Sequence, residues 1–199
     1  SIQYLEHAFK TGNQEDFPAL VKSVSDTLIE QIDNLAKIAT EFSNFAKMPP
    51  AQLEKIALND LVSSVHDLFR KRSEIDFNLY VPIDEVYVEA DRSYLIRILN
   101  NLLKNAVQAI PASRKGVIDI KLTMEHGDAI LSIQDNGVGI PKEMREKVFF
   151  PNFTTKSSGT GLGLAMTKSI IESMQGKIYF KTKVNEGTAF FVEIPLIVE

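Results

Sequence analysis

Apolar side chains in the first quarter of the chain recur at alternating intervals of three and four residues, from Val21 to Phe45, with Gln31 as the polar exception. This 3.5-residue repeat is typical of a helix in a coiled coil or helical bundle. An ordinary amphipathic helix packed on its own domain is the alternative, but the evenness of the repeat favours pairing with other helices. We predict a long helix capped by Asp16, preceded by a first helix over residues 1–10. The repeat consists of Val21, Val24, Leu28, Leu35, Ile38, Phe42 and Phe45.

The helical pattern ends at the sequence KMPPAQ of residues 47–52. We therefore place a partial helical hairpin at residues 1–48, a linker at 49–54 and a second domain at 55–199. Because a helical hairpin alone buries too little apolar surface to be stable, we expect a homodimer that forms through these helices.

After the linker, segments that alternate between apolar and polar residues follow segments with helical spacing. Several antiparallel strands interleaved with helices indicate an α+β domain, an α/β sandwich with one sheet and helices on one of its faces. We expect strands at 54–58, 75–81, 85–90, 117–125, 128–134, 177–184 and 188–198, and helices at 59–72, 92–110, 141–149 and 163–176.

The composition excludes several classes of protein. With 44% hydrophobic and 24% charged residues, the 199-residue chain can bury a core. Its net charge of −4 gives no reason to expect binding to nucleic acid, and the absence of cysteine excludes disulfides and thiolate metal sites. No apolar run approaches the roughly 20 residues of a membrane span. Since the chain opens with Ser1, we expect a fragment of a longer protein whose membrane anchor, if any, lies upstream.

Two asparagines lie one helical turn apart in the predicted helix 92–110, and so share a face. A magnesium ion held mainly by phosphates and water needs one or two protein oxygens, and the amide of Asn101 or Asn105 offers one without adding negative charge. The alternative is a solvated polar stripe with Lys104 and Gln108.

The sequence DAILSIQDNGVGIP predicts a strand that ends at Asp135 and is followed by a turn at Gly137 and Gly139. Asn-Gly after a strand is a common hairpin signal, but the residues that follow have a helical pattern. Glycines here would let a flat ring approach the backbone, and the carboxylate of Asp135 could accept a hydrogen bond from an exocyclic amine such as that of adenine.

Residues 152–164, NFTTKSSGTGLGL, are too polar and too rich in glycine to form a strand or a stable helix. The stretch leads into the predicted helix 163–176, and backbone N–H groups at a helix start favour a phosphate. Hydroxyl groups and Lys156 lie just upstream. The spacing of the glycines is neither that of a P-loop nor that of a dinucleotide fingerprint, and a mobile surface loop is the alternative.

These segments together resemble a known family. NNLLKNAVQAI, DNGVGI, VFFPNFTTK and GTGLGLA resemble, in order, the asparagine, first glycine, phenylalanine and second glycine boxes of sensor histidine kinases, and NEGTAFFVEIP resembles the closing segment of the same Bergerat-type ATP-binding fold. The resemblance covers residues 55–199 and is most similar to the nitrogen-regulation type. Residues 1–48 resemble the hairpin of the dimerisation and phosphotransfer domain, truncated in its first helix.

The resemblance implies ATP and Mg2+ as cofactors. It assigns Asn105 to the magnesium ion with support from Asn101, Asp135 to the adenine amine, and Thr188 to the same pocket. The other residues it assigns to the nucleotide or its flexible lid are Lys104, Gly137, Gly139, Thr154, Thr155, Lys156, Gly159, Gly161, Leu162 and Gly163. Many members carry Lys where this chain has Gln108, which puts one phosphate contact in doubt.

In the gyrase, Hsp90 and MutL branch of the fold, a Glu that activates water occupies the position of Asn101. Because Asn cannot act as a general base, the resemblance implies a kinase that holds ATP for another acceptor. Its partners would be a second copy of the chain and the receiver domain of a response regulator, and its location would be the cytoplasmic side of a sensor that is often membrane-anchored. The alternatives are a protein serine kinase of the same fold and a non-catalytic nucleotide-binding module.

The phosphate acceptor of this family is a histidine followed by an acidic residue and soon by a proline. None of the three histidines, His7, His66 and His126, fits this pattern. We therefore expect the acceptor upstream of Ser1, and a fragment that binds Mg2+–ATP without phosphorylating itself.

Overall fold

The computed structural model describes residue 3 and residues 17–47, 49–71, 75–154 and 160–197. The chain divides into two compact units, Ser1–Met48 with Thr155–Thr160 and Pro49–Thr154 with Gly161–Glu199. The predicted helix 1–10 and the predicted cap Asp16 lie outside the described residues.

Most of the described part of the first unit is the 30-residue helix α2 (Phe17–Ala46), which confirms the helix predicted from the apolar repeat. Several members of the repeat are exposed in the single chain, among them Leu35 with 63% and Phe42 with 55% of the side-chain surface accessible. No helix in the described part of the chain combines the length and the apolar composition that a bilayer crossing requires.

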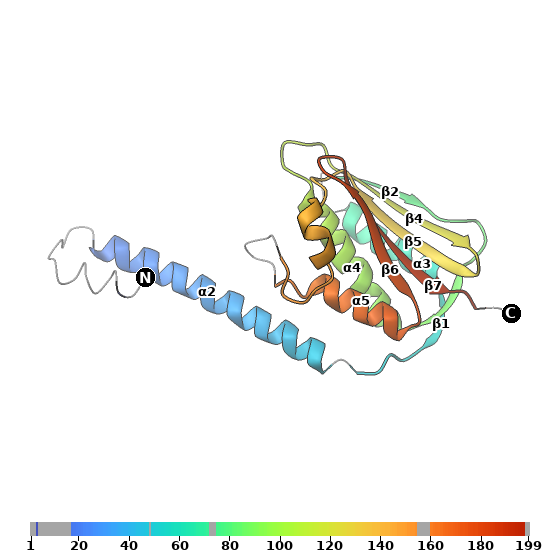
Figure 1. Cartoon of the computed structure of the whole chain (residues 1–199), viewed down its shortest axis with the longest axis horizontal. Coiled ribbons are helices and arrows are strands. Elements are labelled where there is room, and N and C mark those ends of the chain that lie inside the picture. Colours follow the sequence, from blue (N-terminus) through green and yellow to red (C-terminus); the bar gives the residue numbers. More distant parts are fainter. Residues whose placement is uncertain (1–2, 4–16, 48, 72–74, 155–159, 198–199) are drawn as a thin grey trace. The chain divides into compact units, whose positions relative to one another are not determined.

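The second unit is built on a five-stranded sheet with the order β2-β4-β5-β7-β6 (Figure 1). Its central and C-terminal strands pair antiparallel, and the hairpin predicted at the C-terminus is present as β6 and β7. The strand β2 instead pairs parallel with β4. Parallel pairing needs a long crossover, which the segment between them supplies. The strands are β2 (Asp76–Tyr80), β4 (Val117–Glu125), β5 (Asp128–Asp135), β6 (Lys177–Lys183) and β7 (Gly187–Pro195).

Two short strands form a separate sheet, which corrects the expectation of a single sheet. β1 (Glu54–Ala57) pairs antiparallel with β3 (Tyr87–Ala90) and not with the neighbouring strand β2. Alternation along the sequence identifies a strand and its buried face but carries no information on its partner, so this pairing could not be read from the pattern.

Three helices cover one face of the five-stranded sheet, which confirms the α/β sandwich (Figure 1). The inward side chains of the strands alternate with exposed ones, as in β5, where Ala129, Leu131, Ile133 and Asp135 are buried. The helices are α3 (Leu58–Arg70), α4 (Arg92–Ala109) and α5 (Gly163–Ser173), and a short 3-10 helix spans Lys142–Lys147.

Candidate functional site

The helix α4 carries both candidate asparagines, and Asp91 fixes its start. The Oδ1 atom of Asp91 accepts hydrogen bonds from the backbone N–H of Ser93 at 2.9 Å and of Tyr94 at 3.1 Å. Its Oδ2 atom accepts from the N–H of Gln52 at 2.9 Å. Burial by itself raises the pKa of the Asp91 carboxyl, but the hydrogen bonds it accepts outweigh burial and lower the pKa.

Asn101 joins α4 to the start of α5. Its Nδ2 donates to Oγ1 of Thr167 at 2.8 Å, and that hydroxyl donates to the carbonyl of Gly163 at 2.9 Å. Because the single proton of Thr167 is used by Gly163, the hydroxyl can only accept from residue 101. A carboxylate at position 101 could not donate this hydrogen bond. A Cβ on Gly163 would lie 2.4 Å from Oδ1 of Asn101, so a side chain at position 163 would push this amide out of its present position.

Asn105 lies one turn after Asn101 on α4 and is half-buried, whereas Lys104 and Gln108 are exposed. A half-buried carboxamide with an exposed lysine beside it fits the chemistry of a cation that is shared with phosphate groups. The assignment of Asn105 as the magnesium ligand stays a prediction.

Asp135 ends β5 on the helix-covered face and has 3% of its surface exposed. Its Oδ1 atom accepts from the backbone N–H of Gly137 at 2.8 Å and of Thr188 at 3.3 Å. The chain turns after Asp135, and the side chain of Asn136 fixes the turn to the start of β4: its Oδ1 accepts from the N–H of Val117 at 3.0 Å. The prediction that no second strand follows this turn is confirmed, since the next element is the 3-10 helix at Lys142–Lys147.

The glycines after Asp135 meet neighbouring backbone. A Cβ on Gly137 would lie 2.5 Å from the carbonyl oxygen of Ala109, and a Cβ on Gly139 would lie 2.3 Å from that of Lys183. Gly139 also has a φ of +70°, which side chains rarely adopt. These contacts account for both glycines within the protein itself, and the approach of a planar ring stays a prediction.

Two threonine hydroxyls, one on β6 and one on β7, lie next to Asp135. Thr188 has 4% of its surface exposed. Its Oγ1 lies 3.0 Å from Oγ1 of Thr182, which also accepts from the N–H of Ile140 at 2.9 Å. The site predicted from the sequence does not include Thr182. The predicted hairpin around residues 184–186 was sufficient to place this residue opposite Thr188.

Two arginines missed by sequence reasoning brace the loop after Asp135. Arg114 donates through Nη1 to the carbonyls of Asn136 and Gly137, the second at 2.8 Å. Arg145 donates through Nε to the carbonyl of Ile140 at 3.2 Å. No local sequence signal identifies these arginines, because neither belongs to a motif named above and the carbonyls that they contact lie outside their own segments.

The glycine-rich stretch is described in part. Thr155, Lys156 and Gly159 lie outside the described residues, and Thr154 immediately precedes the gap. Gly161 has a φ of +69°, Leu162 is buried, and α5 begins at Gly163. Leu162, the residue at the N-cap, makes no side-chain hydrogen bond to the first turn of α5. Such a helix start fits the phosphate role predicted for it.

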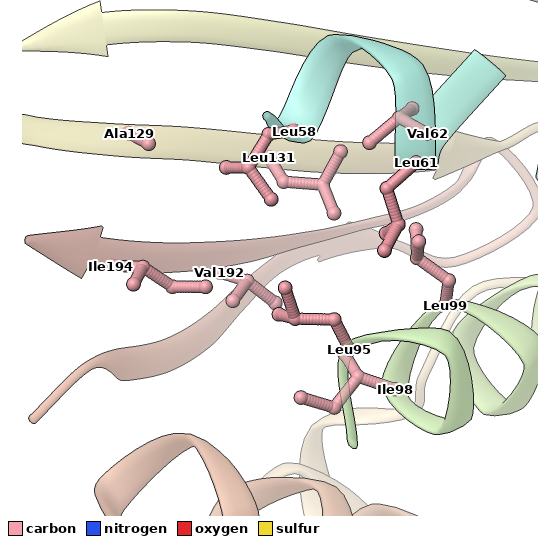
Figure 2. A pocket seen from close by; sticks show the side chains of 10 residues that line it. All are labelled: Leu58, Leu61, Val62, Leu95, Ile98, Leu99, Ala129, Leu131, Val192 and Ile194. Atoms are coloured by element: carbon pink, nitrogen blue, oxygen red, sulfur yellow. The ribbon is translucent and has the colours of Figure 1, made fainter. Parts of the chain in front are cut away.

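Figure 2 shows an apolar cavity in the core, between α3, α4 and strands β5 and β7. It lies away from the candidate site, since no predicted site residue lines it. The lining consists of Leu58, Leu61, Val62, Leu95, Ile98, Leu99, Ala129, Leu131, Val192 and Ile194.

Residues 90–198 match the family described as histidine kinase-, DNA gyrase B-, and HSP90-like ATPase. Among curated proteins, the chain is similar to the signal transduction histidine-protein kinase AtoS of Escherichia coli (strain K12), with 35% identity over 85% of this chain and 28% of AtoS. It is also similar to the nitrogen regulation protein NtrY of Azorhizobium caulinodans, with 32% identity over 88% of this chain and 23% of NtrY. The chain thus spans about a quarter of these relatives.

The chain is also similar to solved structures of histidine kinases. The catalytic domain of histidine kinase ThkA is 36% identical, with a TM-score of 0.65 over 72% of this chain and 95% of that domain. The structure of ThkA in complex with the response regulator protein TrrA matches with 28% identity and a TM-score of 0.70, over 98% of this chain and 57% of that one.

Proposed function

Because the chain belongs to the family of histidine kinase-, DNA gyrase B- and HSP90-like ATPases, with sensor histidine kinases as its relatives, we propose that residues 55–199 bind ATP with Mg2+ and present its γ-phosphoryl group to a histidine outside these 199 residues. The whole-protein activity, autophosphorylation followed by transfer to a response regulator, needs both the ATP-binding domain and the acceptor.

The hydrogen bond from Asn101 to Thr167 carries this proposal. The resemblance places a Glu at this position in the gyrase, Hsp90 and MutL branch, where it acts as a general base on water, and Asn cannot take that role. In this chain the position must donate to a hydroxyl whose own proton is already used by Gly163, so its amide has a structural task that a base could not perform. This supports a domain that holds ATP for transfer and not for hydrolysis.

The nucleotide would be held from three elements. Asn105 on α4 would supply an amide oxygen to the metal, Asp135 at the end of β5 would accept from the base, and the start of α5 would face the phosphates. When bound, Mg2+ neutralises phosphate charge, and phosphoryl transfer depends mainly on positioning and on such charge stabilisation. Lys104 or Lys156 would supply the phosphate contact that Gln108 puts in doubt.

The histidines with a described position are poor acceptors. The ring of His66 is buried in α3, with Nε2 at 3.3 Å from the carbonyl oxygen of Phe77 and Nδ1 at 3.4 Å from Asp67. His126 is exposed, but it lies in the β4–β5 turn, at the opposite end of β5 from Asp135. An in-line attack on ATP needs a ring nitrogen that is both accessible and close to the nucleotide. Neither histidine meets both conditions, which supports an acceptor elsewhere. Acid-labile label from γ-labelled ATP on this chain would contradict that assignment.

The exposed apolar repeat of α2 supports a homodimer, in which each repeat would pack against that of a second copy. The receiver domain of a response regulator would then take the phosphate on an aspartate, on the cytoplasmic side of the membrane where ATP is available.

The Asn105→Ala variant, which removes the amide oxygen, tests the proposal against a degenerate, non-catalytic module. ATP affinity is measured with Mg2+ and with EDTA, and Asn100→Ala, the same substitution on another face of α4, serves as the control. We expect the variant at position 105 to lose most of the Mg2+-dependent part of the affinity while the control keeps it. An unchanged Mg2+ dependence at position 105 would favour the degenerate module.

A further inference from the structure

Three polar side chains lie side by side on the helix-covered face of the sheet, on three adjacent strands. Thr182 of β6 is directly opposite Thr188 of β7. Thr188 in turn lies beside Asp135 of β5, whose Oδ1 accepts its backbone N–H at 3.3 Å. Directly opposite residues on neighbouring strands share a face, so the order Thr182, Thr188, Asp135 continues across the sheet.

The hydrogen bonds of Thr182 determine the direction of the bond between the two hydroxyls. Thr182 has one proton, and it donates this proton to the carbonyl of Gly187 at 3.0 Å. It also accepts from the N–H of Ile140 at 2.9 Å. The contact of 3.0 Å to Oγ1 of Thr188 can then form only if Thr188 is the donor.

Thr188 therefore has no proton left for a ligand, and its hydroxyl can act only as an acceptor. Asp135, when ionised, is also an acceptor. The two groups that the proposed base site offers are thus both acceptors, and a ligand atom that also accepts would leave buried polar atoms unpaired, which is costly.

We propose that Thr182 is a positioning residue that sets base specificity. By fixing the Thr188 proton, it selects a purine with an amine at position 6 against one with a carbonyl at that position. The inference rests on the proposed ATP-binding function and extends it to a residue that does not itself contact the base.

A purely structural role for Thr182 makes a different prediction. The hydroxyl also holds the N–H of Ile140, in the loop that Arg145 braces. Loosening that loop would weaken every nucleotide by the same factor. The ratio of two affinities separates the two roles, because only a change in the Thr188 proton affects one base more than another.

The test compares ATP with inosine triphosphate, in which the amine at position 6 of ATP is replaced by a carbonyl and N1 carries a proton. Because the same two nucleotides are compared in every variant, only the change in their affinity ratio between variants is interpreted. Binding of both to the whole chain is measured by calorimetry in Mg2+ for unsubstituted protein, Thr182→Val and Thr182→Ser. Thr123→Val, which removes a hydroxyl from the outer face of β4, is the matched control. We expect the valine variant to narrow the preference for ATP by about fivefold to tenfold, or about 1 kcal/mol, and serine and the control to keep it.

A second variant covers the case in which Thr182→Val does not fold. Thr188→Val removes the acceptor directly and should narrow the preference by a similar factor, with little further loss when both are combined. An unchanged ratio in either folded valine variant, or an equal loss for both nucleotides, would overturn the inference alone. Failure of the unsubstituted chain to bind ATP would instead overturn the proposed function, and the inference with it.

Discussion

Asn101 and Thr167 are 66 positions apart in the sequence and joined by a hydrogen bond of 2.8 Å, in which the amide of Asn101 is the donor. This bond links the helix that carries Asn105 to the first turn of α5. The bond therefore connects the two helices on which the proposed metal ligand and the proposed phosphate-binding helix start are located.

The Asn101→Asp variant should be less stable by about 1–3 kcal/mol, because it replaces a donor by an acceptor opposite the hydroxyl of Thr167. Urea unfolding measures the difference. Thr167→Val removes the other partner and should lower the free energy of unfolding by a similar amount, with little additional loss in the double variant. An Asn101→Asp protein as stable as the unsubstituted chain would contradict the assigned donor.

Gly187 should tolerate substitution much less well than Gly127, although both have a positive φ. A Cβ on Gly187 would lie 1.9 Å from the carbonyl oxygen of Asp135, while a Cβ on Gly127 would meet no atom within 4 Å. We expect Gly127→Ala to lose about 1–2 kcal/mol from backbone strain alone. Gly187→Ala should lose more than this and should also weaken ATP binding, because it displaces Asp135. Thermal unfolding and nucleotide titration of the two variants provide the comparison, and equal stability would refute it.

The carboxylate of Asp91 should make the free energy of unfolding of the second unit depend on pH in the acidic range. Its pKa in the folded protein lies below the usual value of an aspartate, because the hydrogen bonds that it accepts outweigh the effect of burial. Its contribution is therefore fully present above the unfolded pKa and is lost as the pH falls through the folded pKa. At pH 7, Asp91→Ala should remove about 0.5–2 kcal/mol.

Urea unfolding at pH 7 and pH 3 measures this effect. The difference between unsubstituted protein and Asp91→Ala should be larger at pH 7 than at pH 3, and substitution of the exposed Asp84 should change neither value. A difference that grows on acidification would have the wrong sign for a lowered pKa.

The apolar repeat of α2 should mediate the proposed dimer. Leu35 lies in the repeat and Ile29 outside it, yet both are well exposed, with 63% and 58% of their surface accessible. Leu35→Lys should raise the dissociation constant of the dimer by at least about tenfold, because it places a charge in the apolar repeat. Ile29→Lys should have a much smaller effect. Sedimentation equilibrium measures both. A monomeric unsubstituted chain, or equal effects of the two variants, would contradict this interface.

Local signals in the sequence predicted the elements well. The helix expected at 92–110 is α4 (Arg92–Ala109), since a strong apolar repeat and Pro111 define its extent. The end of a strand was predicted at Asp135 because alternating apolar residues are followed there by Asn-Gly, and β5 ends at this residue. These features depend on residues close in the sequence, where spacing alone is informative.

Long-range relationships could not be predicted in this way. The pairing of β1 with β3 and the parallel pairing of β2 with β4 depend on which strands meet, which alternation does not encode. The role of Arg114 depends likewise on carbonyls 22 and 23 positions away. Motifs identified the groups proposed to contact the nucleotide, and the residues that hold those groups became visible only in the structure.

Calorimetric titration of the chain with ATP, with Mg2+ and then with EDTA, tests the central claim most directly. The account predicts saturable binding of one ATP per chain in Mg2+ and clearly weaker binding in EDTA. The absence of any heat of binding under both conditions would contradict it.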